Sequence, residues 1–290
     1  MFKLIYAEKA KFPVRAMCRA LNVSPSGYYA FHSRPKSARA AENEKLEGQI
    51  QSIHETSKQR YGAPRITAEL KANGTSVSRK RVARLMKSAG ISATPPKQFV
   101  KTTDSNHDLP IAPNLLERDF SPLKANSTWS SDITYVWTAT GWIYLAVILD
   151  LFSRKVIGWA MSDNMETSLC LKALNMALAN RTIDGELIHH SDRGSQYASK
   201  AYTDQLKARG IKISMSRKGD CWDNAPTESF FGTLKKELVY RTKFADMDEA
   251  KTKIFEYIES FYNRRRRHST LDYMTPTEYE NAINYISKAA

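Results

Sequence analysis

Cysteine is scarce in this chain: its 290 residues include only Cys18, Cys170 and Cys221, which are far apart and form no CxxC pair. This excludes a disulfide framework and a thiolate zinc site, and it favours reduced thiols used for packing. No uncharged apolar run reaches the length of about 18 residues that spans a membrane, and the N-terminus lacks the apolar segment of a signal peptide. The sequence predicts a soluble, cytoplasmic protein with no membrane partner.

Acidic residues are rare in one part of the chain only. Residues 1–101 contain 20 Lys and Arg against 6 Asp and Glu, whereas residues 102–290 contain 24 of each kind, so the net charge of +14 arises in the first third. A segregated basic region attracts polyanions and binds phosphates without regard to sequence. Double-stranded DNA is therefore the leading partner, and an anionic membrane surface is the weaker alternative.

The basic third contains two units with the pattern of a helix-turn-helix. In the first unit, apolar residues at helical spacing over 14–21 are followed by a break at 22–25, where Ser24 is suited to cap a second short helix. That second helix carries Tyr28, a candidate DNA contact. A helical hairpin without DNA contact is the alternative interpretation.

In the second unit, helices are predicted over residues 65–73 and 76–91, with Gly74 ending the first and Ser78 capping the second. Val82, Leu85 and Met86 form an apolar stripe on the second helix. A solvated charged surface is the alternative for its other faces, but acids are nearly absent here, which favours recognition of a duplex. The predicted DNA contacts are Arg79, Lys80, Arg81 and Arg84.

A proline-rich linker or extended arm is predicted after the basic units, and the pattern then changes. Five strand-like runs and two amphipathic helices follow in the order βββαβαβ, which predicts a mixed five-stranded α/β sheet with flanking helices. The predicted strands are 129–138, 141–150, 155–162, 186–191 and 211–216, and the predicted helices are 165–181 and 199–210. The predicted segments of the chain are 1–50, 51–93, 94–124, 125–245 and 246–290.

Three acids are candidate catalytic residues and metal ligands. Asp132 lies in the first strand, Asp192 follows the fourth strand, and Glu228 lies on a helix, with 59 residues between the first two and 35 between the last two. Carboxylates brought together in this way could bind Mg²⁺ or Mn²⁺, two ions per site, for phosphodiester chemistry. Bound metal would allow these acids to face a phosphate backbone that they otherwise repel.

Other interpretations compete at neighbouring positions. His189, His190 and Asp192 could suggest zinc, but adjacent residues of a strand point to opposite faces and cannot both converge on one ion. Asp150 is a rival active-site acid, although a turn cap is favoured there. Glu237 is nine positions after Glu228, on the opposite face of the helix, and is expected to be solvated.

The phrases WSSDITYV, HHSDRGSQY and DNAPTESFFGTLKKE carry the three acids. Together with the 35-residue spacing, they resemble the retroviral-integrase-like transposases of bacterial insertion sequences, in particular the downstream-frame product (OrfB) of the IS-three group. The resemblance covers nearly the whole chain. It implies an RNase H-like core, Mg²⁺ dependence, nicking of transposon ends, strand transfer through a circular intermediate, and a bacterial, nucleoid-associated protein that forms a homo-oligomer on DNA.

Active enzymes of this group are typically fusions with an upstream-frame product, which supplies a leucine zipper. No sustained heptad repeat occurs before residue 101, so that product is expected as a further partner. Two alternatives to a transposase stay open. They are a DNA-binding accessory or regulatory protein whose core serves only assembly, and an RNase H-like nuclease without strand transfer.

Lys235 is a further candidate DNA contact. It follows Glu228 by seven residues, which returns it to within about 20° of the same helix face. In retroviral integrases a similar spacing implies contact with the processed DNA end. Lys236 is rotated about 100° away, and the alternative is that both lysines are solvated.

Overall fold

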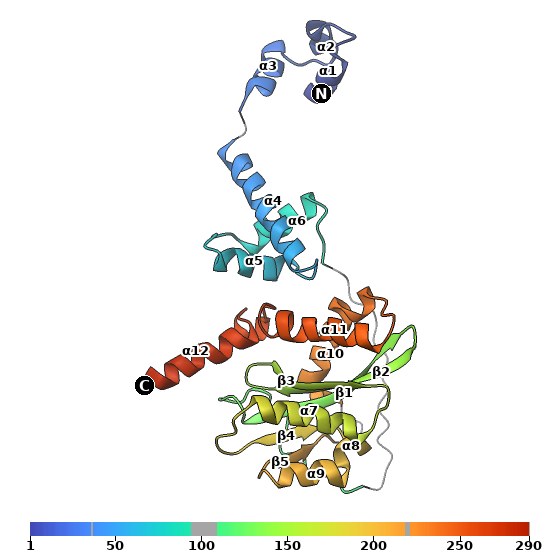
Figure 1. Cartoon of the computed structure of the whole chain (residues 1–290). Coiled ribbons are helices and arrows are strands. Elements are labelled where there is room, and N and C mark those ends of the chain that lie inside the picture. Colours follow the sequence, from blue (N-terminus) through green and yellow to red (C-terminus); the bar gives the residue numbers. More distant parts are fainter. Residues whose placement is uncertain (36, 94–108, 218–220, 290) are drawn as a thin grey trace. The chain divides into compact units, whose positions relative to one another are not determined.

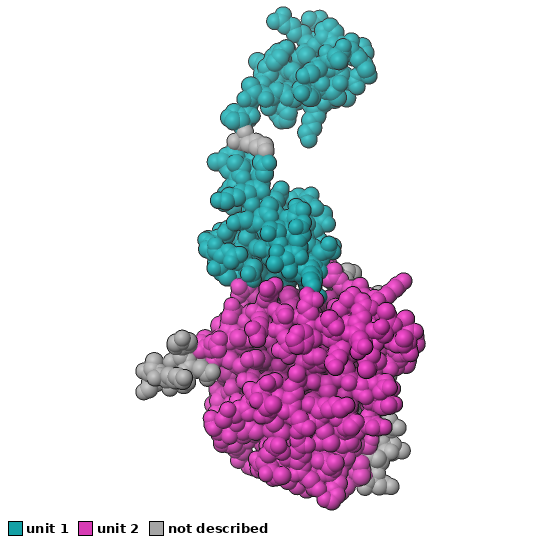
Figure 2. Space-filling view, in the orientation of Figure 1, with its two compact units in different colours: residues 1–92 teal, residues 93–290 magenta. Residues whose placement is uncertain are grey.

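The computed structural model describes residues 1–35, 37–93, 109–217 and 221–289. Contacts divide the chain into two compact units, residues 1–92 and 93–290, which Figure 2 colours separately. This division is coarser than the five predicted segments, whose boundaries stay predictions. No helix of the described residues is long and apolar enough to cross a membrane.

The first unit is helical, and two of its helices begin at the serines predicted to cap them. Ser24 accepts a hydrogen bond from the Gly27 N–H (2.9 Å), and Ser78 accepts one from the Arg81 N–H (3.3 Å). Both predicted caps are therefore confirmed, and so is the buried stripe of the last helix. The helices are α1 (Phe2–Glu8), α2 (Val14–Ala20), α3 (Pro25–Ser33), α4 (Ala38–Thr56), α5 (Ala63–Ala72) and α6 (Arg79–Ser88).

The second unit is built on a five-stranded sheet in the order β3-β2-β1-β4-β5 (Figure 1). β1, β2 and β3 form an antiparallel meander, while β4 and β5 join β1 in parallel. This order and direction are those of the RNase H-like fold, so the predicted fold class is confirmed. The strands are β1 (Thr128–Thr138), β2 (Gly141–Asp150), β3 (Lys155–Ser162), β4 (Ile188–Ser191) and β5 (Lys212–Met215).

Helices cover both faces of the sheet, as β-branched and aromatic strands buried on two sides require. One face packs against α7 (Thr167–Asn180), α8 (Ser195–Ala198) and α9 (Lys200–Lys207). Gly158 makes the approach of α7 possible, because a Cβ there would lie 2.3 Å from the Ala173 carbonyl oxygen.

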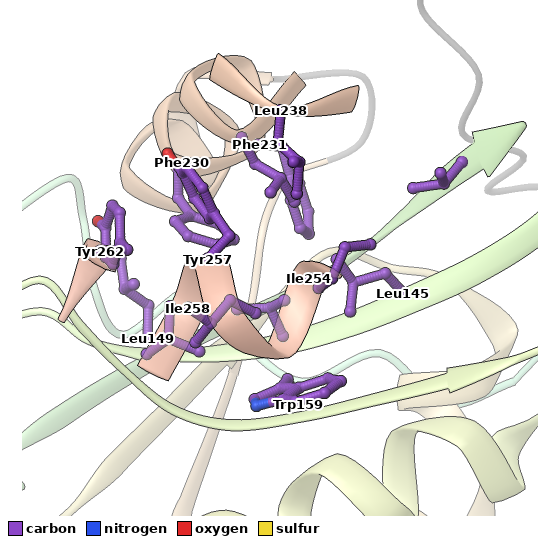
Figure 3. Packing of buried hydrophobic residues seen from close by; sticks show 14 of the residues in the cluster. Leu145, Leu149, Trp159, Phe230, Phe231, Leu238, Ile254, Tyr257, Ile258 and Tyr262 are labelled. Atoms are coloured by element: carbon purple, nitrogen blue, oxygen red, sulfur yellow. The ribbon is translucent and has the colours of Figure 1, made fainter. Parts of the chain in front are cut away.

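The other face packs against α10 (Ala225–Glu237), α11 (Met247–Phe255) and the π-helical turn η3 (Glu256–Tyr262). Figure 3 shows Phe230 and Phe231 of α10 above Ile254 and Ile258, which lie over β2. The remaining elements are the 3₁₀ turns η1 (Cys221–Asn224), η2 (Val239–Arg241) and η4 (Ser269–Leu271), and helix α12 (Pro276–Ala289).

The described part of the predicted linker is an arm that lies along the sheet. Leu116 is buried in the core beneath α10, and the Leu115 N–H donates to the Ser214 hydroxyl (2.9 Å). The Met215 N–H donates to the Pro113 carbonyl (3.3 Å), which joins the arm to the end of β5. Residues 94–108 of the predicted linker lie outside the described residues.

Glu237 is not solvated, and that prediction was wrong. Its carboxylate accepts hydrogen bonds from the Arg266 guanidinium (2.9 Å) and the Tyr257 hydroxyl (2.8 Å). Arg266 is buried as well, so the pair joins the end of α10 to the segment after η3. The helix face opposite Glu228 faces the C-terminal part of this unit rather than water.

Candidate active site

Asp132 and Asp192 occupy neighbouring positions on adjacent strands. β1 and β4 run parallel, and their register pairs Ser131 with Ser191. The next residue along each chain is the aspartate, and adjacent strands lie about 4.8 Å apart. The sheet therefore brings together two carboxylates that are separated by 59 residues of sequence.

Glu228 lies in the first turn of α10, and the start of this helix is fastened to β1. The Ser130 hydroxyl donates to the Asn224 side-chain oxygen (2.5 Å) and lies 2.7 Å from the Thr227 hydroxyl. Ser130 and Asp132 are two positions apart on one strand, so they share a face of the sheet. These contacts place the first turn of α10 over the face that carries Asp132.

The three acids interact electrostatically. Burial raises the pKa of Asp132 well above its usual value, and the Asp192 and Glu228 carboxylates raise it further. The Ile133 N–H, which donates to Asp132 Oδ1 (2.8 Å), and the Lys235 ammonium act in the opposite direction. The negative charge of Asp132 is thus less stabilised than that of a carboxylate in water.

The residues after Asp192 hold its carboxylate in place. The Gly194 N–H donates to Asp192 Oδ1 (2.9 Å), and a Cβ at position 194 would lie 3.0 Å from this oxygen and 2.9 Å from Gln196 Oε1. Arg193 turns away and donates to the Ser216 carbonyl (2.6 Å), at the end of β5. The sequence Asp-Arg-Gly therefore serves to fix an acid at a strand end.

Hard oxygen donors of this kind suit Mg²⁺ or Mn²⁺. The negative charge of the three acids also suits a divalent cation: besides burial, the Asp192 and Glu228 carboxylates contribute to the raised pKa of Asp132. Within the described residues, however, no group of three His, Cys, Asp or Glu side chains is placed as it would be around a bound ion. The three carboxylates are close enough to interact, but their oxygens do not converge on one point.

The adjacent histidines have separate, structural partners. His189 Nε2 lies 3.0 Å from the Tyr202 hydroxyl, whereas His190 Nδ1 lies 2.8 Å from the Ser214 hydroxyl. Burial lowers the pKa of His189 to about 3 and that of His190 to about 4, so both rings are neutral at pH 7. The two rings do not share a site with Asp192, in agreement with the argument against zinc.

Asp150 is a turn cap, as favoured. It is fully buried, and its carboxylate accepts hydrogen bonds from the backbone N–H groups of Asn126 (2.9 Å) and Phe152 (3.0 Å). Burial raises its pKa to about 6, against the effect of these donors and of Arg181. Its oxygens therefore bind the segment before β1 and the segment after β2, and not a substrate or metal.

Lys235 lies beside the carboxylates, whereas Lys236 is exposed. Lys235 is 8% exposed, and its Nζ lies 4.6 Å from the centre of the Tyr135 ring. Burial lowers the pKa of Lys235, and the neighbouring Asp132 carboxylate opposes this shift. The alternative that both lysines are solvated is therefore wrong for Lys235 and right for Lys236.

Sequence reasoning missed Asp223, which precedes α10 and is 1% exposed. Its carboxylate accepts hydrogen bonds from Arg217 Nη2 (2.9 Å), from Arg118 Nε (3.0 Å) and from the Asn114 side chain (3.0 Å). These donors, Arg217 above all, hold its pKa well below the usual range. Asp223 thus clamps the arm and the end of β5 to the turn that leads to Glu228. An acid with partners 105 residues away gives no local signal.

The candidate DNA contacts of α6 divide into two groups. Arg79, Lys80 and Arg84 are exposed. Arg81 instead donates to the Glu42 carboxylate (2.9 Å) and the Asn43 side-chain oxygen (2.8 Å), which joins α6 to α4. Arg81 as a DNA contact is therefore corrected to a structural residue.

Tyr28 is likewise a packing residue and not an available DNA contact. It is 4% exposed and forms the core of the first three helices with Ile5 and Cys18. Its ring packs edge-on against Phe2, at 6.2 Å between centres. Its neighbour Tyr29, which points outward at 57% exposure, is the accessible tyrosine of this helix.

Comparison with known proteins gives family matches in both units of the chain. The family model described as "Integrase core domain" matches residues 122–221, a second model of that description matches residues 209–276, and the model described as "HTH-like domain" matches residues 41–99. Among solved structures, the HTLV-2 integrase catalytic core domain in complex with magnesium is 17% identical, with a TM-score of 0.43, over 55% of this chain and 98% of that chain.

Two bacterial relatives match over almost their full length. The "Insertion element IS600 uncharacterized 31 kDa protein" of Shigella sonnei is 45% identical over 93% of this chain and all of its own length. The "Transposase InsF for insertion sequence IS3A" of Escherichia coli is 42% identical over 96% of this chain and 98% of its own. Since both identity and coverage are high, the chain belongs to the InsF-type transposases of the IS3 family, which combine an HTH-like domain with an integrase core.

Proposed function

We propose that this protein is a DNA transposase that nicks transposon ends and transfers the cut strand to target DNA, with Asp132, Asp192 and Glu228 as its catalytic metal ligands. The observation that carries the proposal is that three carboxylates, from β1, the end of β4 and the start of α10, lie close enough to interact electrostatically within an integrase core. A protein that only binds DNA has no chemical use for such a group.

Mg²⁺ or Mn²⁺ bound by these carboxylates, as two ions, would activate the attacking water or 3′-hydroxyl and stabilise the leaving 3′-oxygen. The chain itself orients the ligands: the Ile133 N–H holds Asp132 and the Gly194 N–H holds Asp192. Lys235 supplies a positive charge next to Asp132, where a phosphate would approach.

The proposed partners are the double-stranded terminal repeats of the element and the target DNA. Arg79, Lys80 and Arg84 of α6 would bind phosphates in the first unit. Pairing two transposon ends requires more than one active site, so we propose a homo-oligomer on DNA, with the upstream-frame product as a further partner.

The first unit should bind duplex DNA with strong salt dependence. Affinity falls about a thousand-fold between 50 and 200 mM salt for a protein that neutralises about six phosphates. Arg79→Ala should reduce the slope of log affinity against log salt by about 1. Fluorescence anisotropy with labelled duplex measures both.

Arg81→Ala is the matched control on the same helix. It removes an equal charge, but one that is paired with Glu42, so it should lower the stability of the unit more than the salt slope. A residue 93–290 fragment that bound as tightly and as salt-sensitively as residues 1–92 would place the main DNA contact elsewhere. Of the basic run 264–267, Arg266 is buried in its ion pair, and this limits that possibility.

Lys235→Ala should impair end joining far more than Lys236→Ala. A charge-assisted hydrogen bond is worth about 1.5–3 kcal/mol, which corresponds to about a 10- to 150-fold loss. Joining of labelled ends by the two purified variants, matched for thermal stability, is the measurement. Equal activities would show that Lys235 serves only packing against Tyr135.

The alternatives are separated by one experiment with a labelled transposon end, target DNA and Mg²⁺. A joined product identifies a transposase, cleavage without joining identifies an RNase H-like nuclease, and a mobility shift alone identifies an accessory DNA-binding protein.

A further inference from the structure

The β1–β2 hairpin carries two exposed tryptophans near its turn. Trp137 is 56% exposed and Trp142 is 51% exposed, and the two face each other across the hairpin. Their rings pack edge-to-face with centres 4.9 Å apart, and Trp142 also packs edge-on against Tyr135 at 5.0 Å. Each ring is therefore held by another while half of its surface faces water. Exposed aromatic surface of this kind marks an interaction site more often than a single exposed residue does.

A basic segment lies against the end of this hairpin. Thr138 forms a parallel bridge with Phe244, and the Ala139 N–H donates to the Phe244 carbonyl (2.9 Å). These contacts bring the exposed Lys243, which precedes Phe244, near Trp137, and the exposed Arg241 lies two residues earlier in the chain. Figure 1 shows the hairpin projecting from the sheet near α11.

Three of the four acids between residues 229 and 249 make hydrogen bonds within the protein, and the fourth, Asp248, is exposed. Glu237 is the only acid between residues 229 and 245, and it is turned inward to Arg266. At the start of α11, Asp246 accepts from the Glu249 N–H (2.8 Å), and Glu249 accepts from the Ala245 N–H (2.7 Å). The surface beside Trp137 and Trp142 thus combines exposed aromatic rings with positive charge, as nucleic-acid-binding surfaces do.

This surface is connected to the carboxylates around β1. Trp137 follows Asp132 by five residues on this strand, or about 16 Å, and the odd spacing turns the two side chains to opposite faces of the sheet. Lys235 joins the two sides, because its ammonium interacts with Asp132 and lies 4.6 Å from the centre of the Tyr135 ring, on the side of Trp137. A DNA strand with one phosphate at Asp132 would reach the tryptophans within about five nucleotides at the duplex spacing of about 3.4 Å per nucleotide, and within fewer where the strand is unpaired and extended.

We propose that Trp137 and Trp142 stack against unpaired bases of the DNA strand that leaves the carboxylates. Every base has a face for stacking, and each stacked base contributes about 1–3 kcal/mol. A second copy of the chain fits this surface less well: two tryptophans fall far short of the ~800 Å² per partner of a stable interface. Across a two-fold axis, Arg241 and Lys243 would also face their own copies.

The test compares two probes that require no knowledge of the element's ends. One is a short blunt duplex, and the other is the same duplex with about five unpaired thymidines, enough to span about 16 Å even at the duplex spacing. Binding to the full chain is measured by anisotropy without divalent ions. The native chain should prefer the tailed duplex by about 5- to 150-fold, the equivalent of about one stacked base.

Trp137→Ala/Trp142→Ala should abolish this preference and leave affinity for the blunt duplex unchanged, whereas Trp137→Tyr/Trp142→Tyr should keep most of it. Phe255→Ala removes another exposed aromatic residue of the same unit, 52% exposed, and should change nothing. The inference is overturned if the double alanine variant keeps the preference for the tailed duplex, or if its only change is in oligomer size measured by light scattering.

The inference rests on the proposed function, but the two fail separately. Cleavage of a transposon end by the native chain tests the proposed function, and the preference measured without metal tests this surface.

Discussion

Asp192→Asn is expected to abolish cleavage and joining while affinity for DNA stays equal or rises slightly. The substitution keeps the size of the side chain but removes one of the charges through which the carboxylates would hold a divalent ion. Bound metal contributes several kcal/mol to such reactions, so a loss of ~1,000-fold or more is expected at about 1.4 kcal/mol for each tenfold change. The same holds for Asp132→Asn and Glu228→Gln. Gel assays of nicked and joined products, with anisotropy for affinity, measure the two effects.

Asp163→Asn is the control for charge alone, because Asp163 is an exposed acid in the loop after β3. It should behave like the native chain in both assays. Cleavage by Asp192→Asn at the native rate would refute the assignment of the catalytic ligands. A loss of DNA binding in step with cleavage would instead place Asp192 in DNA recognition.

The sheet could be predicted because its signals are local. Runs rich in Val, Ile, Tyr and Trp and bounded by turn residues mark the first three strands, and the last two are short runs next to amphipathic helices, in long connections that imply crossovers. The adjacency of Asp132 and Asp192 follows from the same pattern once β1 and β4 are neighbours, since each acid stands one residue beyond a register pair. The choice of these acids depended on a resemblance as well as on position.

The errors all concern side chains whose partners are distant in sequence. Glu237 meets Arg266 after 29 residues, and Arg81 meets Asn43 after 38. Helical spacing shows which face a residue occupies, but not what covers that face. Tyr28 and Tyr29 are adjacent and chemically identical, yet one is buried and one is exposed, because only the packing of three short helices distinguishes them.

Asp223→Asn is expected to impair the use of metal more than it impairs folding. The carboxylate loses its charge, and the hydrogen bonds from Arg118 and Arg217 weaken together. Both arginine side chains are about half exposed, 44% and 55%, so solvent limits the cost in stability to about 2 kcal/mol. The 3₁₀ turn η1, which contains Asp223, would then fix the start of α10 less firmly, and Glu228 lies in the first turn of that helix. A higher Mg²⁺ concentration for half-maximal cleavage is the expected result, with partial recovery at saturating Mg²⁺.

Asp119→Asn is the matched control, because Asp119 lies in the same arm, is exposed, and accepts only a local hydrogen bond from the Ser121 N–H (3.1 Å) among those described. Thermal unfolding and a Mg²⁺ titration of cleavage should be measured for both variants. If Asp223 acts through Glu228, the Mg²⁺ requirement rises for Asp223→Asn alone and is unchanged for Asp119→Asn. A lower melting temperature with an unchanged Mg²⁺ requirement would show that the clamp stabilises the arm without positioning the catalytic acid. Asp223 is joined to both the arm and the end of β5. This outcome would therefore show that its contacts contribute to the stability of the core without affecting the position of the carboxylates.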